Sequence, residues 1–280
     1  MMALRKMMEL AITPWEEATA WLLIGAIFFA MRSCKYLRTT VNEEGKRTRI
    51  LRMRNISFSK GGRRVKHHEK GLEDSDIVII TFEFQKNDRR DEQVHMFKTE
   101  DSILNPVKAW AKTVQRVRKY SASSDDSTVC TYYTEENERR DIQADHVRGR
   151  LRAIVKIIGE ESLGFGVEEV GLHSIRSGGA MAMFLSGTSP IVIKKIGRWS
   201  SEAFLEYIRE QVEEFTAGVS QKMLEFEDFN NLRMRPTTQI KNKHHNNNED
   251  GPKPVPHSVI FSRLALEGES KRRPRRRNRK

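Results

Sequence analysis

Residues 171–209 read GLHSIRSGGAMAMFLSGTSPIVIKKIGRWSSEAFLEYIR, and four of their side chains form a spaced set. His173 and Arg176 lie three positions apart, so a helix places both on one side. Trp199 follows a Gly-Arg pair that favours a turn, and Tyr207 comes eight residues later. Each of these residues is common by itself, and their order and spacing together indicate a functional site.

Cap and breaker residues divide this stretch into three predicted helices. The first begins near Ser174 and ends at Gly187. A Ser-Pro pair at residues 189–190 begins the second, and Gly197 ends it. Ser200 caps the third, which carries the tyrosine.

A second apolar stretch, residues 18–31, leads to another arginine. Thr13, Pro14 and Glu16 form a helix start, because threonine caps, proline suits the first helical position and glutamate reaches back to the cap. The helix is predicted to be buried and to run towards Arg32. Charged residues close it on both sides before the ~20 apolar residues that a membrane span requires. An arginine at the end of so apolar a run requires an anion, either a carboxylate of the protein or a phosphate.

A β-rich region follows. Residues 48–58 alternate basic and apolar side chains and are predicted to form a strand with a basic face, and residues 59–71 a loop. Residues 77–84 and 93–97 are predicted to form a hairpin with Lys86 at or near its tip. The residues expected to contact a polyanion on this basic face are Arg49, Arg52, Arg54, Arg63, Arg64 and Lys66.

The other predicted elements are mainly helical. An Asn-Pro pair caps a helix over residues 105–120, and a Ser/Asp-rich loop covers residues 121–128. A helix over residues 136–158 and a loop over residues 159–166 precede the stretch that carries the spaced set. An amphipathic helix is expected over residues 213–226, after that stretch.

Charge is concentrated in two parts of the chain. The net charge is +12, but residues 235–280 hold 13 Lys/Arg and 4 Asp/Glu, which is +9 and leaves +3 for the rest. Within that remainder, residues 46–70 hold ten basic residues and one acid. The C-terminal KRRPRRRNRK is typical of a disordered tail that serves as a nuclear-localisation signal or a nucleic-acid arm. This distribution favours an acidic polymer as partner.

Composition also limits the class of protein. At 280 residues, of which 38% are apolar, the chain is long enough for one good core. The two cysteines, Cys34 and Cys130, are too few for a disulfide framework and favour a reducing compartment. The histidines at residues 67–68 and 244–245 are adjacent pairs whose side chains diverge, so no metal site is expected.

The spaced set has the chemistry of a phosphodiester site. A phosphodiester gains negative charge during displacement, and fixed cationic donors stabilise that charge. Arg32 and Arg176 can each make two parallel hydrogen bonds to phosphate oxygens. His173 can accept a proton or donate a hydrogen bond, and the indole N–H of Trp199 can donate to the same oxygens.

A nucleophile and a general acid complete the set. Tyr207 is a phenol with an ordinary pKa near ~10, so it attacks only where nearby cations stabilise the phenolate. The leaving oxygen needs a proton, and Lys86 on the hairpin is a reasonable donor. Lys98 and Lys60 are its rivals for this role.

Together these residues resemble the tyrosine recombinases, the phage-integrase-like DNA breaking-rejoining enzymes. The segments FFAMRSCKYL, LHSIRSGGAMAMFLSG and IGRWSSEAFLEYIR are most similar to eukaryotic crypton-type recombinases of mobile elements. The resemblance spans residues 14–226. The family pattern Arg, Lys, His-x-x-Arg, His/Trp, Tyr falls on Arg32, Lys86, His173, Arg176, Trp199 and Tyr207.

The resemblance implies a mixed α+β, mainly α-helical catalytic domain over residues 1–230, with a small antiparallel sheet on one side. Residues 231–280 are then a disordered tail. It implies cofactor-free and metal-free recombination of double-stranded DNA through a 3′-phosphotyrosyl intermediate. The partners are DNA and three further copies of the chain, which assemble through the helix over residues 213–226, and the location is the nucleus.

Two departures from the family pattern keep other functions open. Lys35 stands where the family usually has an acid, three positions after the first arginine, and the usual N-terminal DNA-clamping domain is expected to be missing. A DNA-binding protein without catalysis, derived from such an element, is the alternative function. A relaxing activity like that of type IB topoisomerases is a third.

Overall fold

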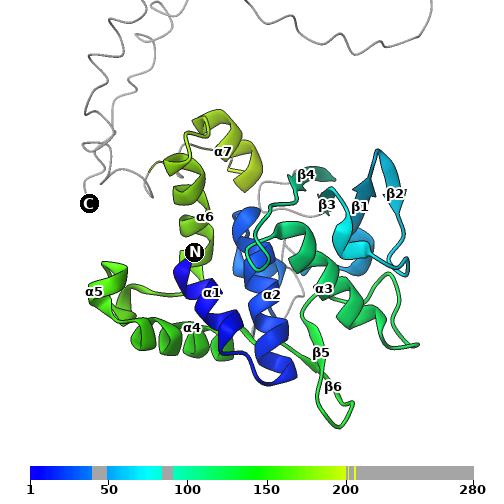
Figure 1. The fold of residues 1–280 in the computed structure, drawn as a ribbon, viewed down its shortest axis with the longest axis horizontal. Coiled ribbons are helices and arrows are strands. Elements are labelled where there is room, and N and C mark those ends of the chain that lie inside the picture. The colour runs from blue at the N-terminus through cyan, green and yellow to red at the C-terminus, as the bar shows by residue number, and fades with distance from the viewer. Residues whose placement is uncertain (40–48, 84–90, 200, 202–204, 206–280) are drawn as a thin grey trace, which may run out of the picture. The chain divides into compact units, whose positions relative to one another are not determined.

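The computed structural model of the chain describes residues 1–39, 49–83, 91–199, 201 and 205. The chain divides into two units, Met1–Glu225 and Phe226–Lys280, and all described residues belong to the first. They form a mixed α+β structure, as the sequence predicts, with more residues in helices than in strands (Figure 1). The helices are α1 (Met2–Glu9), α2 (Pro14–Phe28), α3 (Pro106–Arg118), α4 (Ala144–Ile158), α5 (Glu160–Leu163), α6 (His173–Leu185) and α7 (Pro190–Gly197). The strands are β1 (Ile56–Lys60), β2 (Arg63–Val65), β3 (Ile77–Phe82), β4 (Glu92–Phe97), β5 (Thr131–Tyr133) and β6 (Arg139–Asp141).

Helix α2 begins and ends close to where the sequence places it. The Thr13 hydroxyl accepts a hydrogen bond from the Glu16 N–H, and the Glu16 carboxylate accepts one from the Thr13 N–H, so the capping box is present. The helix was expected to run towards Arg32, but it ends at Phe28. Ala30 then adopts a positive φ of 42°, which turns the chain before it reaches Arg32. The arginine therefore lies beyond the helix end and not on the helix.

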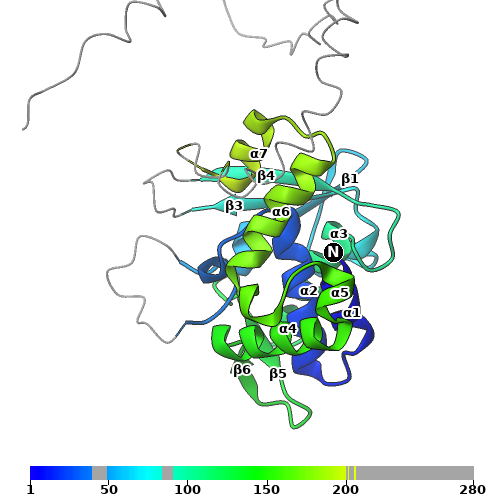
Figure 2. The same ribbon diagram turned by 90° about the vertical axis from the view of Figure 1, so that its left-hand side faces the viewer.

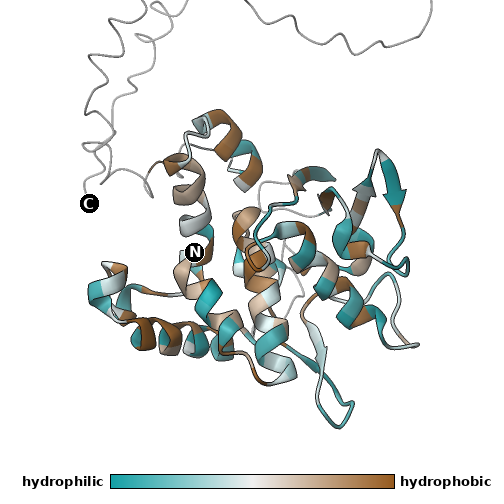
Figure 3. Ribbon diagram, viewed as in Figure 1, coloured by the Kyte–Doolittle hydropathy of each residue, from teal (hydrophilic) through white to brown (hydrophobic). Residues whose placement is uncertain are grey.

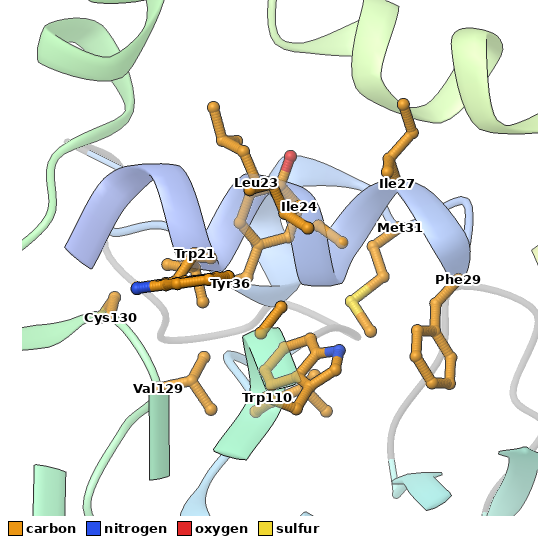
Figure 4. Close-up of a cluster of buried hydrophobic side chains, with 14 of the residues drawn as sticks. Trp21, Leu23, Ile24, Ile27, Phe29, Met31, Tyr36, Trp110, Val129 and Cys130 are labelled. Carbon is orange, nitrogen blue, oxygen red and sulfur yellow. The ribbon is translucent and has the colours of Figure 1, made fainter. Parts of the chain in front are cut away.

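The hydrophobic core is built around α2, which contacts α1, α3 and α6. Every residue from Ala18 to Ile27 is buried, so the helix has no solvent-exposed stripe in this part. Figure 4 shows Trp110 of α3 packed beneath α2. A Cβ at Gly25 would lie 2.8 Å from the Trp110 Nε1 atom, so glycine permits this close approach. Within the described ranges, no helix is long and apolar enough to cross a membrane.

Four antiparallel strands form a sheet in the order β2-β1-β3-β4 (Figures 1 and 2). Phe58 of β1 pairs with Val65 of β2 and with Val78 of β3, which fixes the register. Alternate residues of β3, including Ile80 and Phe82, are buried, so one face of the sheet joins the core. Helix α3 contacts β3 and β4.

Two predictions in this region are wrong in part. The strand expected over residues 48–58 begins only with β1. A 3₁₀ turn precedes β1, because the Asn55 side chain accepts a backbone N–H at the start of that turn at 2.8 Å. The loop expected over residues 59–71 contains β2. Gly61 and Gly62, with φ of 54° and 77°, make the turn that folds β2 back on β1.

The helix expected over residues 136–158 begins later than predicted, at Ala144. The residues before it form β6, which pairs with β5 in a second, two-stranded sheet. Asn137 has a φ of 63° in the turn between the two strands. The Ile142 N–H donates to the Cys130 carbonyl at 2.8 Å, so a backbone pairing between distant residues replaces the first turns of the predicted helix.

Helices α6 and α7 agree with the sequence prediction within two or three residues. Helix α5 is one short turn inside the loop expected over residues 159–166. Gly179 lets α6 pack closely on α2, because a Cβ there would lie 2.3 Å from the Ile27 carbonyl oxygen. The predicted helix over residues 213–226 and the predicted tail lie outside the described residues.

Candidate functional site

Arg32, Arg176 and Arg198 lie near one another where α2 ends, α6 begins and α7 ends. Figure 1 shows these three helices. Arg32 follows the end of α2 and is half-buried. Among the described residues, none forms a hydrogen bond or ion pair with its side chain. The sequence had left two anions open for this arginine, a carboxylate or a phosphate. The described part of the chain supplies no carboxylate partner.

Arg176 joins the ends of two helices that are far apart in the sequence. It lies in the first turns of α6 and is 1% exposed. Its Nη1 donates to the Ala30 carbonyl at 2.5 Å, and its Nη2 donates to the Gly197 carbonyl at 2.8 Å. Its guanidinium carbon lies 4.0 Å from the ring centroid of Trp199, which is a cation–π distance. The sequence named this arginine as a site residue, and the structure places it beside Trp199.

Trp199 is buried beside that guanidinium. It forms a small apolar cluster with Ala30, Ala180 and Ile193, separate from the main core. The backbone at Gly197 lies against the indole ring of Trp199, because a Cβ built at Gly197 would overlap with the ring atoms. The indole therefore packs against the guanidinium of Arg176.

His173 is the first residue of α6 and is exposed. Partial desolvation, followed by the positive charges of Arg176 and Arg32, lowers the pKa of its imidazole below 6.5. The helix N-terminus also disfavours an imidazolium. The side chain is therefore neutral at pH 7 and able to accept a proton.

Arg198 is a member of the cluster that sequence reasoning missed. It caps the C-terminus of α7 with φ 57° and ψ 45°, a left-handed conformation that favours glycine. Its Nη1 donates to the carbonyls of Ile196 at 2.6 Å and Phe29 at 3.3 Å, and its guanidinium carbon lies 3.7 Å from the ring centroid of Phe82. Burial, followed by the charges of Arg176 and Arg32, lowers its pKa to about 9. The sequence feature that could have identified Arg198 is an arginine at a helix end where glycine is usual.

Lys35 is a second cation that the sequence did not assign to the site. Its side chain is 4% exposed, and its Nζ donates to the Arg49 carbonyl at 3.5 Å. Burial, and then the charges of Arg198 and Arg32, lower its pKa to about 8. Lys35 is therefore buried near Arg198 and Arg32 and is charged for most of the time at pH 7.

The nucleophile and the general acid of the predicted set, Tyr207 and Lys86, lie outside the described residues. The two rivals of Lys86 are described, and the structure places neither at the cluster. Lys60 and Lys98 lie at the end of the sheet where β1 ends, β3 begins and β4 ends. Lys98 also pairs with an aspartate at 3.3 Å. The opposite end of the sheet, with Phe82, contacts Arg198.

The predicted basic face carries acids as well as arginines. Arg54 pairs with Glu83 at 2.8 Å, and both Arg52 and Arg54 donate to Asp126 in the Ser/Asp-rich loop. Arg63 pairs with Glu69 at 2.8 Å, so three of the arginines named from the sequence have a carboxylate partner. Arg64 and Lys66, exposed beside them, line a hollow of about 590 Å³ on this face. The remaining member of that set, Arg49, is exposed next to the buried lysine.

No model of a known protein family matches this chain, and no curated protein is significantly similar to it. In the residues that the structure describes, no group of three or more His, Cys, Asp or Glu side chains is placed to hold a metal ion. What the cluster can do chemically therefore follows from its own side chains, which are cations, a neutral imidazole and an indole.

Proposed function

We propose that this protein cleaves and rejoins DNA strands as a site-specific recombinase of the tyrosine type. One observation carries the proposal. The guanidinium of Arg32 lies close enough to that of Arg198 to lower its pKa, and neither arginine has a carboxylate partner among the described residues. Cations held together against their mutual repulsion favour an anionic ligand.

A phosphodiester suits this cluster better than a simple anion. Arg176 is fixed by two backbone carbonyls and an indole ring, so its position is set before any ligand binds. Preorganised donors of this kind stabilise the charge that develops on the equatorial oxygens of phosphorus. Arg32, at the edge of the cluster and half-buried, offers a full guanidinium fork to those oxygens.

In this proposal Tyr207 is the nucleophile. Its phenol oxygen attacks the scissile phosphorus while neutral His173 takes its proton. The bond from phosphorus to the leaving 5′-oxygen breaks, and Lys86 gives that oxygen a proton. The 3′-phosphotyrosyl bond conserves the energy of the original ester, so the reverse attack by a 5′-hydroxyl rejoins a strand.

The rest of the proposed assembly follows from the resemblance. Double-stranded DNA is the substrate and lies along the basic face. Four copies of the chain form the active complex through the helix over residues 213–226. The basic C-terminal decapeptide directs the protein to the nucleus of a eukaryotic cell.

A nicked suicide substrate tests the catalytic proposal. The full chain is incubated with nicked duplexes whose sequence around the nick is randomised, so that a short product diffuses away and traps the covalent complex. We expect an adduct on a denaturing gel from the unchanged protein and none from Tyr207→Phe. Arg32→Gln should reduce its yield by about 10²–10³, the usual cost of one donor to a developing oxyanion.

Tyr120→Phe is the matched control, because its hydroxyl donates to Asn137, a residue that takes no part in the arginine cluster. This variant should form the adduct as the unchanged protein does. An adduct that persists in Tyr207→Phe contradicts the role of that tyrosine. Loss of the adduct in both variants shows only damage to the fold, which circular dichroism detects.

A DNA-binding protein without catalysis is the second candidate, and Lys35 is the observation that favours it. A buried cation in place of the family's acid adds repulsion next to Arg32 instead of orienting it. This candidate predicts salt-sensitive DNA binding and no adduct with any nicked duplex. One trapped complex that depends on Tyr207 excludes it.

A further inference from the structure

A cavity of about 560 Å³ lies between β4 and α7, next to the arginine cluster. Helix α7 is beside β4 in both Figures 1 and 2. The cavity shares Arg198 and Trp199 with the cluster. Its volume is within the ~300–1,000 Å³ of ordinary small-ligand sites. None of the functions assigned above uses it.

The buried guanidinium of Arg198 forms one wall of this cavity. The side chain is 6% exposed, and its two hydrogen bonds both use Nη1. In the described part of the chain, Nε and Nη2 donate to no acceptor. Two donor groups on a guanidinium that is otherwise held in place are therefore available to a ligand in the cavity.

The backbone of Arg198 indicates that the side chain is needed there. Helix α7 ends in the left-handed conformation, where glycine is favoured and a larger residue costs about 1 kcal/mol or more. The Phe82 ring and the Phe29 carbonyl hold the guanidinium from the other side. A residue with a strained backbone, whose side chain is held in place but has donor groups without an acceptor, is typical of a binding site.

The other walls of the cavity have two kinds of chemistry. Lys194 and Lys195 add positive charge from the last turn of α7, and Glu92 is the one carboxylate among the described lining residues. Pro190 and Ile191 form an apolar side, and Ile191 is 69% exposed. Most of α7 is drawn as hydrophobic in Figure 3. A cationic side next to an apolar side matches a ligand with a phosphate and a flat apolar group.

We propose that this cavity binds one nucleotide of the cleaved DNA strand, adjacent to the scissile phosphate. The phosphate of that nucleotide accepts hydrogen bonds from Nε and Nη2 of Arg198, and its base lies on Ile191 and Pro190. The assignment rests on the proposed function, because it takes the neighbouring cluster to hold the phosphate that is cut. It assigns Arg198, which takes no part in the proposed cleavage step, to a second phosphate, and it adds a site for a base.

Calorimetric titration of the full chain tests this site without any cleavage. A 5′-phosphorylated dinucleotide is one probe and inorganic phosphate is the other. We expect the dinucleotide to bind more tightly than phosphate. Arg198→Gln should weaken binding of both by about tenfold or more, the loss expected for a charge-assisted hydrogen bond. Arg140→Gln, on the β5-β6 hairpin and paired with Glu138, should change neither.

Ile191→Ser keeps the test decisive if Arg198→Gln fails to fold, because Ile191 is an exposed side chain. This variant should weaken the dinucleotide several-fold and leave phosphate unchanged. Equal affinity of the two probes, with no effect of Ile191→Ser, overturns the nucleotide site and leaves an anion site only. No binding of either probe overturns it as well.

The same variants separate this proposal from the catalytic one. If the dinucleotide binds as described but no nicked duplex yields an adduct, the cavity stands and the proposed cleavage fails. If adducts form and Ile191→Ser changes neither binding nor adduct yield, the cleavage stands and the cavity assignment fails.

Discussion

Replacing Lys35 with methionine should make the protein more stable and bind DNA more weakly. The Nζ atom is buried near two arginines, and the pKa of the group falls from an ordinary 10.5 to about 8. At ~1.4 kcal/mol per pKa unit, this drop corresponds to a penalty of about 3 kcal/mol for keeping the charge in the folded protein at neutral pH. Methionine has a similar length and no charge, so it removes the penalty.

Part of that gain is offset by a lost hydrogen bond. The Nζ donates to the Arg49 carbonyl at 3.5 Å, a long bond whose loss costs about 0.5–1 kcal/mol. We therefore expect Lys35→Met to raise the free energy of unfolding by about 2–2.5 kcal/mol at pH 7, or the Tm by roughly 4–10 °C for a unit of this size. Lys119→Met, at an exposed lysine on the end of α3, should stay within ~0.5 kcal/mol of the unchanged protein.

The pH dependence has a definite sign. Between pH 8 and pH 10.5 the unfolded chain holds the Lys35 proton and the folded protein does not. The stability contributed by this group therefore rises with pH across that window. The advantage of Lys35→Met should be full below pH 8 and should vanish above pH 10.5.

Urea unfolding at several pH values between 7 and 10 measures these differences, and fluorescence anisotropy with labelled duplex DNA measures binding. The methionine variant should bind DNA several-fold more weakly, because one cation of the cluster is lost. A variant that is less stable at pH 7, or whose advantage does not change with pH, would refute the view that the lysine is buried at a cost.

Three further changes test other parts of the structure. Gly179→Ala should destabilise the protein by about 1–3 kcal/mol in urea unfolding, because its Cβ would lie 2.3 Å from the Ile27 carbonyl oxygen. Its control is Gly149→Ala in α4, where a Cβ meets nothing within 4 Å, and this change should stabilise the protein by up to ~1 kcal/mol. Asp126→Asn should tighten DNA binding and steepen its salt dependence, because Arg52 loses its carboxylate partner while Arg54 keeps Glu83; unchanged affinity at low salt would mean that this face does not contact DNA. The rate of adduct formation should fall in acid, at a pH below the ordinary 6.5 of histidine, because protonated His173 cannot accept the tyrosine proton. A rate that stays flat down to the pH at which the protein unfolds would exclude this role.

Local signals in the sequence predicted the helices well. The capping box at Thr13 and the Ser-Pro start of α7 depend on neighbouring residues only, so they could be identified without the fold. The strand over residues 48–58 and the early start of the helix over residues 136–158 were wrong for the opposite reason. The N–H of Ile142 pairs with the carbonyl of Cys130, and such a partner cannot be found from local propensity.

The same division applies to the candidate site. The sequence alone determined which residue types are present and how they are spaced, and these indicated Arg32, His173, Arg176 and Trp199 before any fold was known. Only the tertiary structure decided that Arg198 and Lys35 belong with them. Arg198 reaches the cluster because α7 ends in a left-handed turn against the end of α2, 169 residues away from its acceptor Phe29. The charge of a buried cation depends on everything packed around it, and the sequence does not list those neighbours.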